Sequence, residues 1–231
     1  MSAWDVACEG SWFAQLFRGQ LRRCSREDYA GLHVAVDAQA LLSVGLSAYA
    51  LKLAQDPSST AHIAYCTRRA LLLREWGAEC VFVLAGDDEG DHGQERREEQ
   101  RREGLRRLGA GDRGGAHRCF ARALRATPEM AAALARELEE MGVRCITAPG
   151  SAAAQAAFLA ICGHVDACLS PTGEAAMLGS PRTLLGLSRD GDGQEVRLQE
   201  ALGQHSVEEL QAACLLRACG PPALRASDAL R

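Results

Sequence analysis

Short apolar runs alternate with longer segments of helical periodicity along this chain, and this alternation limits the possible folds more than any other feature. Leu32–Val36 and Cys80–Leu84 are continuous apolar runs of the kind that form strands buried on both faces of a sheet. Residues 38–55 and 60–76 place apolar side chains at three- and four-residue spacing, as amphipathic helices do. Further strand candidates follow at Arg144–Thr147, Ala167–Leu169 and Thr183–Leu187. We therefore expect an α/β fold with a mainly parallel central sheet flanked by helices.

One uncharged stretch is long enough to be compared with a membrane span. Residues 145–165 carry no formal charge when His164 is neutral. The turn Pro149-Gly150-Ser151 interrupts the stretch, and alanine supplies most of the remainder. A short strand, a turn and an Ala-rich helix account for it better, so we expect no membrane partner.

Length and charge exclude some classes of protein. A chain of 231 residues with 47% hydrophobic and 24% charged residues has a globular composition and fits one domain, or at most two small ones. The net charge of −4 and the pI near 5.9 argue against binding to nucleic acid by bulk charge alone. Any such binding has to come from a local basic patch.

The ten cysteines do not form a disulfide or zinc framework in the sequence, because no Cys-x-x-Cys pair occurs. Six of them lie inside apolar stretches, where we expect them to act as small buried hydrophobes: Cys66, Cys80, Cys145, Cys162, Cys168 and Cys214. A reducing intracellular compartment is the better interpretation.

Residues 91–107 differ from the rest of the chain, because six arginines and five acids replace nearly all apolar residues. The arginines are Arg96, Arg97, Arg101, Arg102, Arg106 and Arg107. Glu98 with Arg102 and Glu103 with Arg107 form i,i+4 pairs that favour a solvated helix, and residues 109–115 are expected to be a flexible break. The segment is either a surface helix stabilised by its own ion pairs or an arch whose arginines follow phosphates.

Asp37 follows the first strand directly, and ligands of parallel α/β sheets gather beyond the carboxyl ends of strands. It is therefore the best single candidate for a metal ligand or a catalytic carboxylate. Aspartate at a junction between strand and helix is also a common N-cap. Magnesium-dependent phosphodiester chemistry needs several carboxylates, so Asp37 alone does not define a site.

Four segments follow one another along the chain: HVAVDAQALLSVG, CVFVLAG, HRCFARALRATPEMAAAL and GVRCITAPGSAAAQAAFL. In their order and spacing they resemble the 5′-nuclease family of exonuclease 1 and flap endonuclease, and exonuclease 1 most of all. The resemblance covers roughly residues 8 to 225, with a shortened arch around residues 104–115. It implies a PIN-like α/β fold with a helical arch and two magnesium ions that serve cleavage of DNA near 5′ ends and flaps.

The resemblance also implies which acids should bind metal, and most of those positions hold other residues here. Asp37 matches the first acid and Glu174 stands where one of the later acids is expected. The remaining positions are Ala85, Ser151, Ala153, Thr172 and Gly220. Asp87 and Asp88, just after Ala85, are further candidates for a metal ligand.

Other features of the family are changed as well. The only lysine is Lys52, so the early arch lysine is not identifiable, and several residues precede Glu9, the position that matches the start of the family. We expect an N-terminal extension and first helix in residues 1–30, a nuclease-like half with the arch in 31–110, a second half in 111–220, and a truncated tail in 221–231, where the family's helix-two-turn-helix should begin. The family implies a nuclear location. A mitochondrial presequence is the alternative, weakly indicated by Arg18, Arg22 and Arg23 and opposed by Asp5 and Glu9.

Three hypotheses about function follow. The chain is a degenerate exonuclease 1-like nuclease domain, catalytically impaired, that acts as a DNA-binding, protein-binding or structural module. Alternatively, it is a residually active magnesium-dependent 5′–3′ exonuclease or flap endonuclease of DNA repair that acts on DNA with a 5′ end or flap. Third, it is a divergent or truncated gene product whose resemblance says little about its present role.

Overall fold

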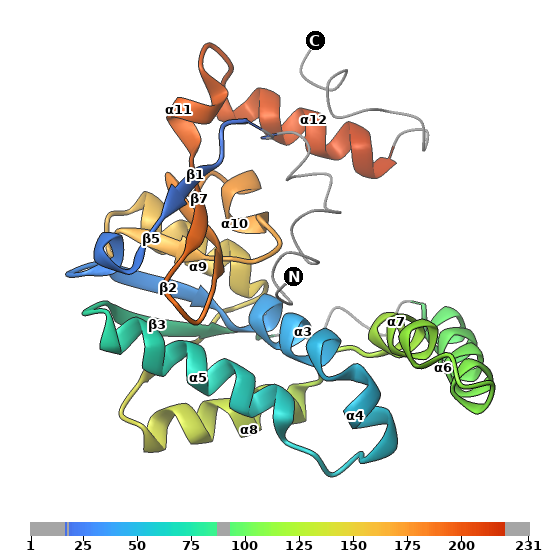
Figure 1. Ribbon diagram of the computed structural model, residues 1–231. Coiled ribbons are helices and arrows are strands. Elements are labelled where there is room, and N and C mark those ends of the chain that lie inside the picture. The colour runs from blue at the N-terminus through green and yellow to red at the C-terminus, as the bar shows by residue number, and fades with distance from the viewer. Residues whose placement is uncertain (1–16, 18, 87–92, 220–231) are drawn as a thin grey trace.

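The computed structural model describes residues 17, 19–86 and 93–219, and the fold is a sheet covered by helices on both faces (Figure 1). The described strands are β1 (Arg22–Cys24), β2 (His33–Asp37), β3 (Glu79–Leu84), β4 (Arg144–Thr147), β5 (Ala167–Leu169), β6 (Arg182–Leu187) and β7 (Gly193–Arg197). They form a seven-stranded sheet in the order β1-β7-β6-β5-β2-β3-β4. Strands β2 to β6 run parallel, and β7 and β1 are antiparallel additions at one edge. The predicted α/β fold with a mainly parallel sheet is confirmed.

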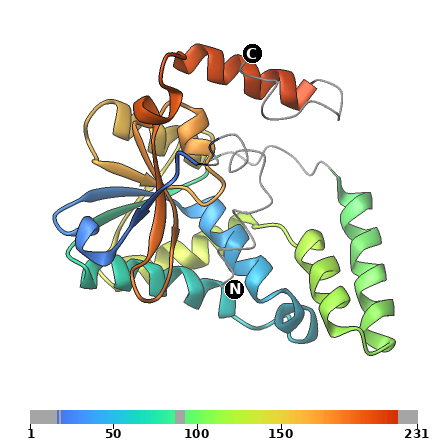
Figure 2. The same ribbon diagram turned by 45° about the horizontal axis from the view of Figure 1, so that its top comes forward.

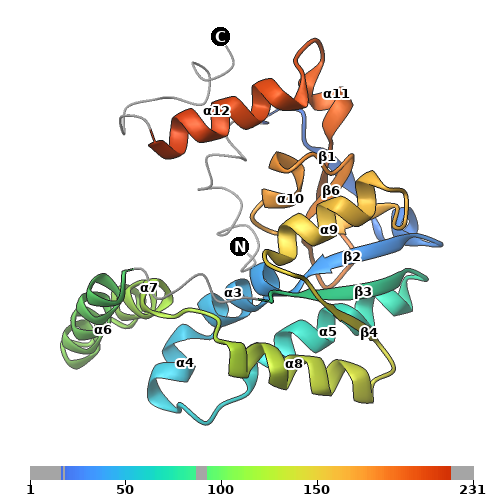
Figure 3. The ribbon, with the colours of Figure 1, turned by 180° about the vertical axis from the view of Figure 1, so that it is seen from behind.

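The helices lie between these strands in sequence. They are η1 (Arg26–Tyr29), α3 (Ala38–Ala48), α4 (Ala50–Gln55), α5 (Ala61–Glu75), α6 (Gln94–Gly109), α7 (Arg113–Ala123), α8 (Pro128–Glu140), α9 (Ala152–Ile161), α10 (Glu174–Met177), α11 (Leu198–Leu202) and α12 (Val207–Cys219). Helices α3, α5 and α8 cover one face of the parallel strands, and α9 with α10 covers the other (Figures 1 and 3). The predicted halves 31–110 and 111–220 both contribute strands to this one sheet.

The core on the α9 face is made largely of alanine, which lets the helix lie close to the sheet. Ala152, Ala156, Ala157 and Ala160 pack against Ala35 of β2 in one buried cluster. Small side chains of this kind lose little rotamer freedom on burial. The Ala-rich stretch is therefore a packed surface-layer helix, and no helix among the described residues is long and apolar enough to span a membrane.

Predicted and observed elements agree closely for the parallel strands, and β4 and β5 match the predicted ranges. The helix expected over residues 38–55 is divided at Tyr49 into α3 and α4. Tyr49 is the C-cap of α3, where its backbone N–H donates to Gly45 O, and it is also the N-cap of α4. Strands β1 and β7 were not predicted. Of the six cysteines expected to be buried, Cys66 and Cys168 are buried and Cys162 is exposed. The other three, Cys80, Cys145 and Cys214, are only half-buried.

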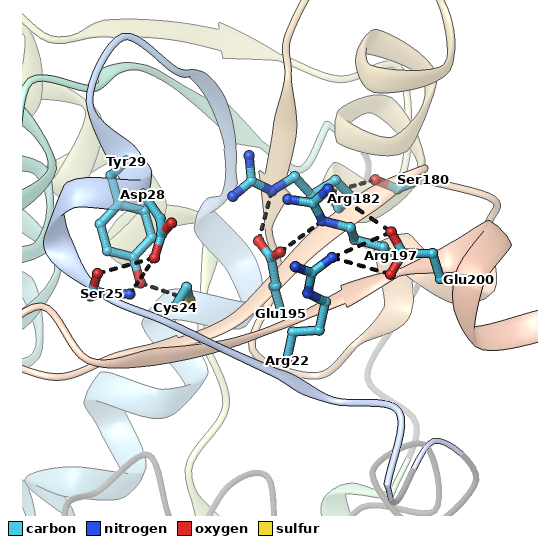
Figure 4. A network of polar contacts seen from close by, with 10 residues as sticks. All are labelled: Arg22, Cys24, Ser25, Asp28, Tyr29, Ser180, Arg182, Glu195, Arg197 and Glu200. Atoms are coloured by element: carbon cyan, nitrogen blue, oxygen red, sulfur yellow. Dashed lines mark hydrogen bonds and ion pairs between the residues drawn. The ribbon is translucent and has the colours of Figure 1, made fainter.

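Strand β7 escaped prediction because its buried face carries a charge. Glu195 of β7 is only 3% exposed, and its carboxylate accepts from Nε of Arg182 at 2.7 Å and Nε of Arg197 at 2.9 Å (Figure 4). Charged side chains are rarely buried unless they are paired with an opposite charge. A strand whose buried face carries such a pair lacks the alternation of apolar and polar residues by which strands are recognised in a sequence. On β1, Arg22 pairs with Glu200 at 3.2 Å. Ion pairs thus close the antiparallel edge of the sheet.

Helices α6 and α7 form a hairpin that stands away from the sheet (Figure 2). The expected flexible break at residues 109–115 is wrong, because α6 runs to Gly109 and α7 already begins at Arg113. Asp112 orders the turn: its carboxylate accepts from the N–H of Gly115 at 2.8 Å and from Arg107 at 3.2 Å. An N-cap of this type closes the first turn of a helix. The hairpin packs on α4 through a small cluster that includes Ala50, Ala116 and Phe120.

Candidate active-site pocket and arch

A pocket of about 280 Å³ lies at the carboxyl ends of β2 and β3, where three helices begin. Its wall contains the N-caps of α3, α8 and α9, which are Asp37, Thr127 and Ser151. This is the edge of a parallel sheet at which ligands usually bind. The pocket therefore lies at the carboxyl ends of the parallel strands, where the sequence predicts a ligand site beside Asp37.

Asp37 lies at the bottom of this pocket and is 2% exposed. Its Oδ1 accepts from the N–H of Ala40 at 3.0 Å, and its Oδ2 accepts from the hydroxyl of Ser170 at 3.3 Å. Burial raises the pKa of Asp37 to about 6, with the charge of Glu174 acting in the same direction and the bond from Ala40 opposing both. Both oxygens of Asp37 thus bond to the protein itself, and the residue is the N-cap of α3.

The positions to which the resemblance assigns metal-binding acids come together around the same pocket. Besides Asp37, they are Ala85, Ser151, Ala153, Thr172 and Glu174. Ser151 caps α9 through Ala154 N at 3.3 Å, and Thr172 accepts from Glu174 N at 3.4 Å. Asp87, Asp88 and Gly220 lie outside the described residues. The six described positions therefore line one pocket, and four of them hold alanines or hydroxyl residues.

This set of side chains does not fit a pair of magnesium ions. Magnesium prefers carboxylate oxygens, and two-metal sites share several of them. Asp37 and Glu174 are the carboxylates of the pocket wall, and the alanines at 85 and 153 offer no side-chain oxygen. No group of three or more His, Cys, Asp or Glu within residues 19–86 and 93–219 is arranged to hold a metal ion.

Five of the six arginines of α6 fall into two groups, and Arg101 belongs to neither. Arg102, Arg106 and Arg107 pair with acids of the hairpin: Arg102 with Glu98 at 3.4 Å, and Arg106 and Arg107 each with Glu103 at 2.6 Å. The hydrogen bonds from Arg106, and then from Arg107, lower the pKa of Glu103 to about 2. The predicted pairs of Glu98 with Arg102 and Glu103 with Arg107 are both confirmed. These three arginines are therefore engaged within the hairpin.

Arg96 and Arg97 belong to the second group and line a hollow of about 410 Å³ between α6 and α7. Arg122 of α7 and Gln100 complete its wall together with Gly93. No acid of the described residues lines this hollow. Arg101 does not line the hollow, and it forms no ion pair with any residue in the described part of the chain.

Sequence reasoning missed two arginines of the site region, Arg122 in the hollow and Arg125 in the pocket wall. Both lie in a segment quoted for the resemblance, just before Pro128. The available signal was Pro128, which predicts that a helix begins directly after this segment, and the N-cap of that helix, Thr127, lines the pocket.

Comparison with known proteins identifies the family of this chain, whose parallel sheet has a pocket at the strand ends beside a two-helix hairpin. The family model of the XPG N-terminal domain matches residues 11–107, and that of the XPG I-region matches residues 142–220. The chain therefore belongs to the XPG family of 5′ nucleases.

Among curated relatives, exonuclease 1 of Oryza sativa subsp. japonica is 30% identical over 207 residues, covering 84% of this chain and 25% of the rice protein. Exonuclease 1 of Danio rerio is 28% identical over 203 residues, covering 83% and 25%. The chain thus spans about a quarter of the length of these relatives.

Solved structures share the fold at low identity. Flap endonuclease-1 from Methanococcus jannaschii superposes with a TM-score of 0.68 at 19% identity, covering 93% of this chain and 75% of that one. The catalytic core of Rad2 in complex with DNA substrate gives 0.68 at 20%, covering 95% and 66%. Human GEN1 in complex with Holliday junction DNA gives 0.60 at 20%, covering 90% and 50%.

Proposed function

We propose that this chain is a catalytically impaired 5′-nuclease domain that binds DNA with a 5′ end or flap. The observation that carries the proposal is the lining of the pocket, in which Asp37 and Glu174 are the carboxylates among the described residues. Two-metal phosphodiester chemistry needs several carboxylates. Asp37 itself is the N-cap of α3, with one oxygen accepting from Ala40 N and the other from the Ser170 hydroxyl.

The alanines around Asp37 support the same proposal. Ala153 is 2% exposed, and Ala85 packs against the buried alanine cluster that joins α9 to β2. Carboxylates at these positions would repel one another unless cations held them together. Replacing them by alanine removes this repulsion, so the sheet edge is stable without metal.

DNA binding is proposed for the arch hollow. Arg96 and Arg122 face it from two helices, and guanidinium groups suit phosphate oxygens by charge and geometry. The DNA complexes of Rad2 and GEN1, which share the fold, support this assignment. A local patch of this kind reconciles DNA binding with a net charge of −4. Should DNA not bind, a protein partner becomes the proposed ligand.

A residually active magnesium-dependent nuclease is the second candidate. The observation that favours it is that Asp37 and Glu174 face one pocket closely enough for the charge of Glu174 to raise the pKa of Asp37. A cation would relieve this repulsion. Asp87 and Asp88 follow β3 and Ala85 directly in sequence. The pocket would then hold a single weakly bound ion rather than a pair.

An assay on a labelled 5′-flap duplex with 10 mM Mg²⁺ tests the two candidates. The expected result is no cleavage, with binding that weakens as salt rises. Turnover that Asp37→Ala abolishes would sink the impaired-domain proposal and support the second candidate. Turnover that survives Asp37→Ala points to a contaminating nuclease, which repurification removes. Binding that does not change between 50 and 200 mM salt would contradict the role of the arch arginines.

A further inference from the structure

A second pocket lies at the opposite edge of the sheet, where the parallel strands begin. It has a volume of about 330 Å³ and lies among the first residues of β2, β3 and β4 and the loop before β5. In Figure 1 this edge is at the left, away from α3 and the hairpin. The pocket shares no wall residue with the candidate active-site pocket or the arch hollow. It is therefore an independent feature of the fold.

The charged groups of this amino-edge pocket are mainly cationic. Arg74 and Arg144 line it together with His33 and His164, against one acid, Glu79. Glu79 lies 3.7 Å from Nε2 of His33. The same histidine also lies 3.2 Å from Oδ2 of Asp166 through its Nδ1. With the histidines neutral, the two arginines and Glu79 leave one positive charge in excess on the pocket wall.

The two arginines are held differently. Nη1 of Arg74 donates to the carbonyl of Met141 at 3.0 Å, which fixes its guanidinium at the rim. The side chain of Arg144 has no hydrogen bond or ion pair with any other residue in the described part of the chain. A guanidinium offers five N–H donors in a planar fork that fits two oxygens of a phosphate. Arg144 has all of them available.

The floor of the pocket is apolar. Val34 is fully buried, and Val143 and Val165 are less than one tenth exposed. A cavity of about 150 Å³ is large enough for benzene, so this one has room for a ring together with a phosphate group. Binding pockets for small molecules combine such an apolar lining with a few polar groups that set orientation.

We propose that the amino-edge pocket binds a small phosphate monoester with an apolar body, held by Arg144 and Arg74 over the valine floor. The phosphate lies at the arginines, and the apolar part of the ligand covers Val143 and Val165. This site is independent of DNA binding in the arch and of any chemistry at Asp37.

Titration of ¹⁵N-labelled protein with phenyl phosphate tests the proposal. We expect saturable shifts at the amides of Val81, Gly142 and Arg144, with a Kd below about 1 mM. Inorganic phosphate should bind the same amides at least tenfold more weakly, because it lacks the apolar body. Benzyl alcohol, which lacks the charge, should not saturate them. A carboxylate probe, benzoate, should also bind more weakly than phenyl phosphate, since it carries a single charge.

Three variants make the test specific. Arg144→Gln should weaken phenyl phosphate at least tenfold, whereas Arg136→Gln, on the exposed side of α8, should leave it unchanged. Arg122→Gln removes an arch arginine and should not affect these amides. Equal affinity of wild type and Arg144→Gln, or shifts confined to arch residues, would overturn the proposal. Arg74→Gln serves as a second probe if Arg144→Gln alters the spectrum of the free protein.

Discussion

Gly104 of α6 lies directly against the ring of Phe120 of α7, so that a Cβ at position 104 would come within 2.7 Å of the ring atom Cε1. Phe120 is 3% exposed and belongs to the cluster that joins the hairpin to α4. The missing side chain of Gly104 therefore sets how closely the two arch helices approach. A glycine inside a charged helix, unfavourable by itself, is explained by this contact.

Gly104→Ala should loosen the hairpin. The added methyl group has to displace the Phe120 ring, and overpacking of this kind costs about 1–3 kcal/mol. The measurement is urea unfolding combined with limited proteolysis between α6 and α7. Gly109→Ala is the matched control, because a Cβ at position 109 meets nothing within 4 Å. Equal loss of stability in both variants would contradict the contact.

Asp37→Asn should stabilise the protein at neutral pH. Asparagine can accept from Ala40 N and donate to Ser170 Oγ, and it carries no buried charge. Because burial raises the pKa of Asp37 to about 6, ionisation at pH 7.5 opposes folding by roughly 2–3 kcal/mol. The folded state binds the proton more tightly than the unfolded state, so wild-type stability from this group is present below about pH 4 and is lost as pH rises through 6.

The test compares urea unfolding of wild type and Asp37→Asn at pH 4 and pH 7.5. The gain should be present at pH 7.5 and vanish at pH 4, and exposed Asp190→Asn should show neither effect. Addition of 10 mM Mg²⁺ should leave the gain unchanged. If Mg²⁺ raises the stability of wild type alone, Asp37 binds metal, and the impaired-domain proposal fails.

Glu195→Gln should destabilise the antiparallel edge of the sheet. It removes the charge that pairs with Arg182 and Arg197, and loss of one partner of a buried pair costs about 3–5 kcal/mol. Because Arg197 is partly exposed, we expect the lower half of this range. Glu200→Gln, whose pair with Arg22 is exposed, should cost less than about 1 kcal/mol. Thermal unfolding of both variants measures the two losses of stability. Equal losses in Glu195→Gln and Glu200→Gln would contradict the role of the buried ion pairs.

Arginines of the arch should contribute unequally to DNA binding. Each phosphate contact adds about 0.9 to the slope of log K against log salt, so Arg96→Gln with Arg122→Gln should reduce the slope by about 2. Arg106→Gln, whose side chain pairs with Glu103, should change it by less than about 0.5. Fluorescence anisotropy on a 5′-flap duplex between 50 and 200 mM salt measures both. A larger effect of Arg106→Gln would show that the ion pairs of α6 open on binding.

The sequence predicts the parallel half of this sheet well and the antiparallel half poorly. β2 and β3 are continuous apolar runs, and such runs can be recognised in the sequence without knowledge of the neighbouring strands. Strand β7 depends on Glu195 and its two arginine partners, one of them on β6, and such pairing exists only once the chain is folded. The turn at Asp112 was missed for a similar reason, since glycines beside it indicate flexibility until the cap is seen.

Part of the candidate site can be predicted from the sequence, and the rest requires the folded structure. The position of Asp37 at a strand end was sufficient to identify it both as a cap and as a candidate ligand. That Ala85, Ser151, Ala153, Thr172 and Glu174 share its pocket required the fold. The split of the α6 arginines into paired and hollow-lining groups required the packing of α6 against α7, because the hollow lies between these two helices.

The pairing of β1 with β7 has a consequence for synthesis. β1 is the first described strand of the chain, and its pairing partner β7 is the last. At ~5–20 residues per second, a ribosome exposes β1 on the order of ten seconds before β7 is made. During that interval Arg22–Cys24 has no strand to join, so its unpaired backbone groups can associate with other chains. Yield in cells should therefore depend on chaperones that shield this segment until β7 emerges.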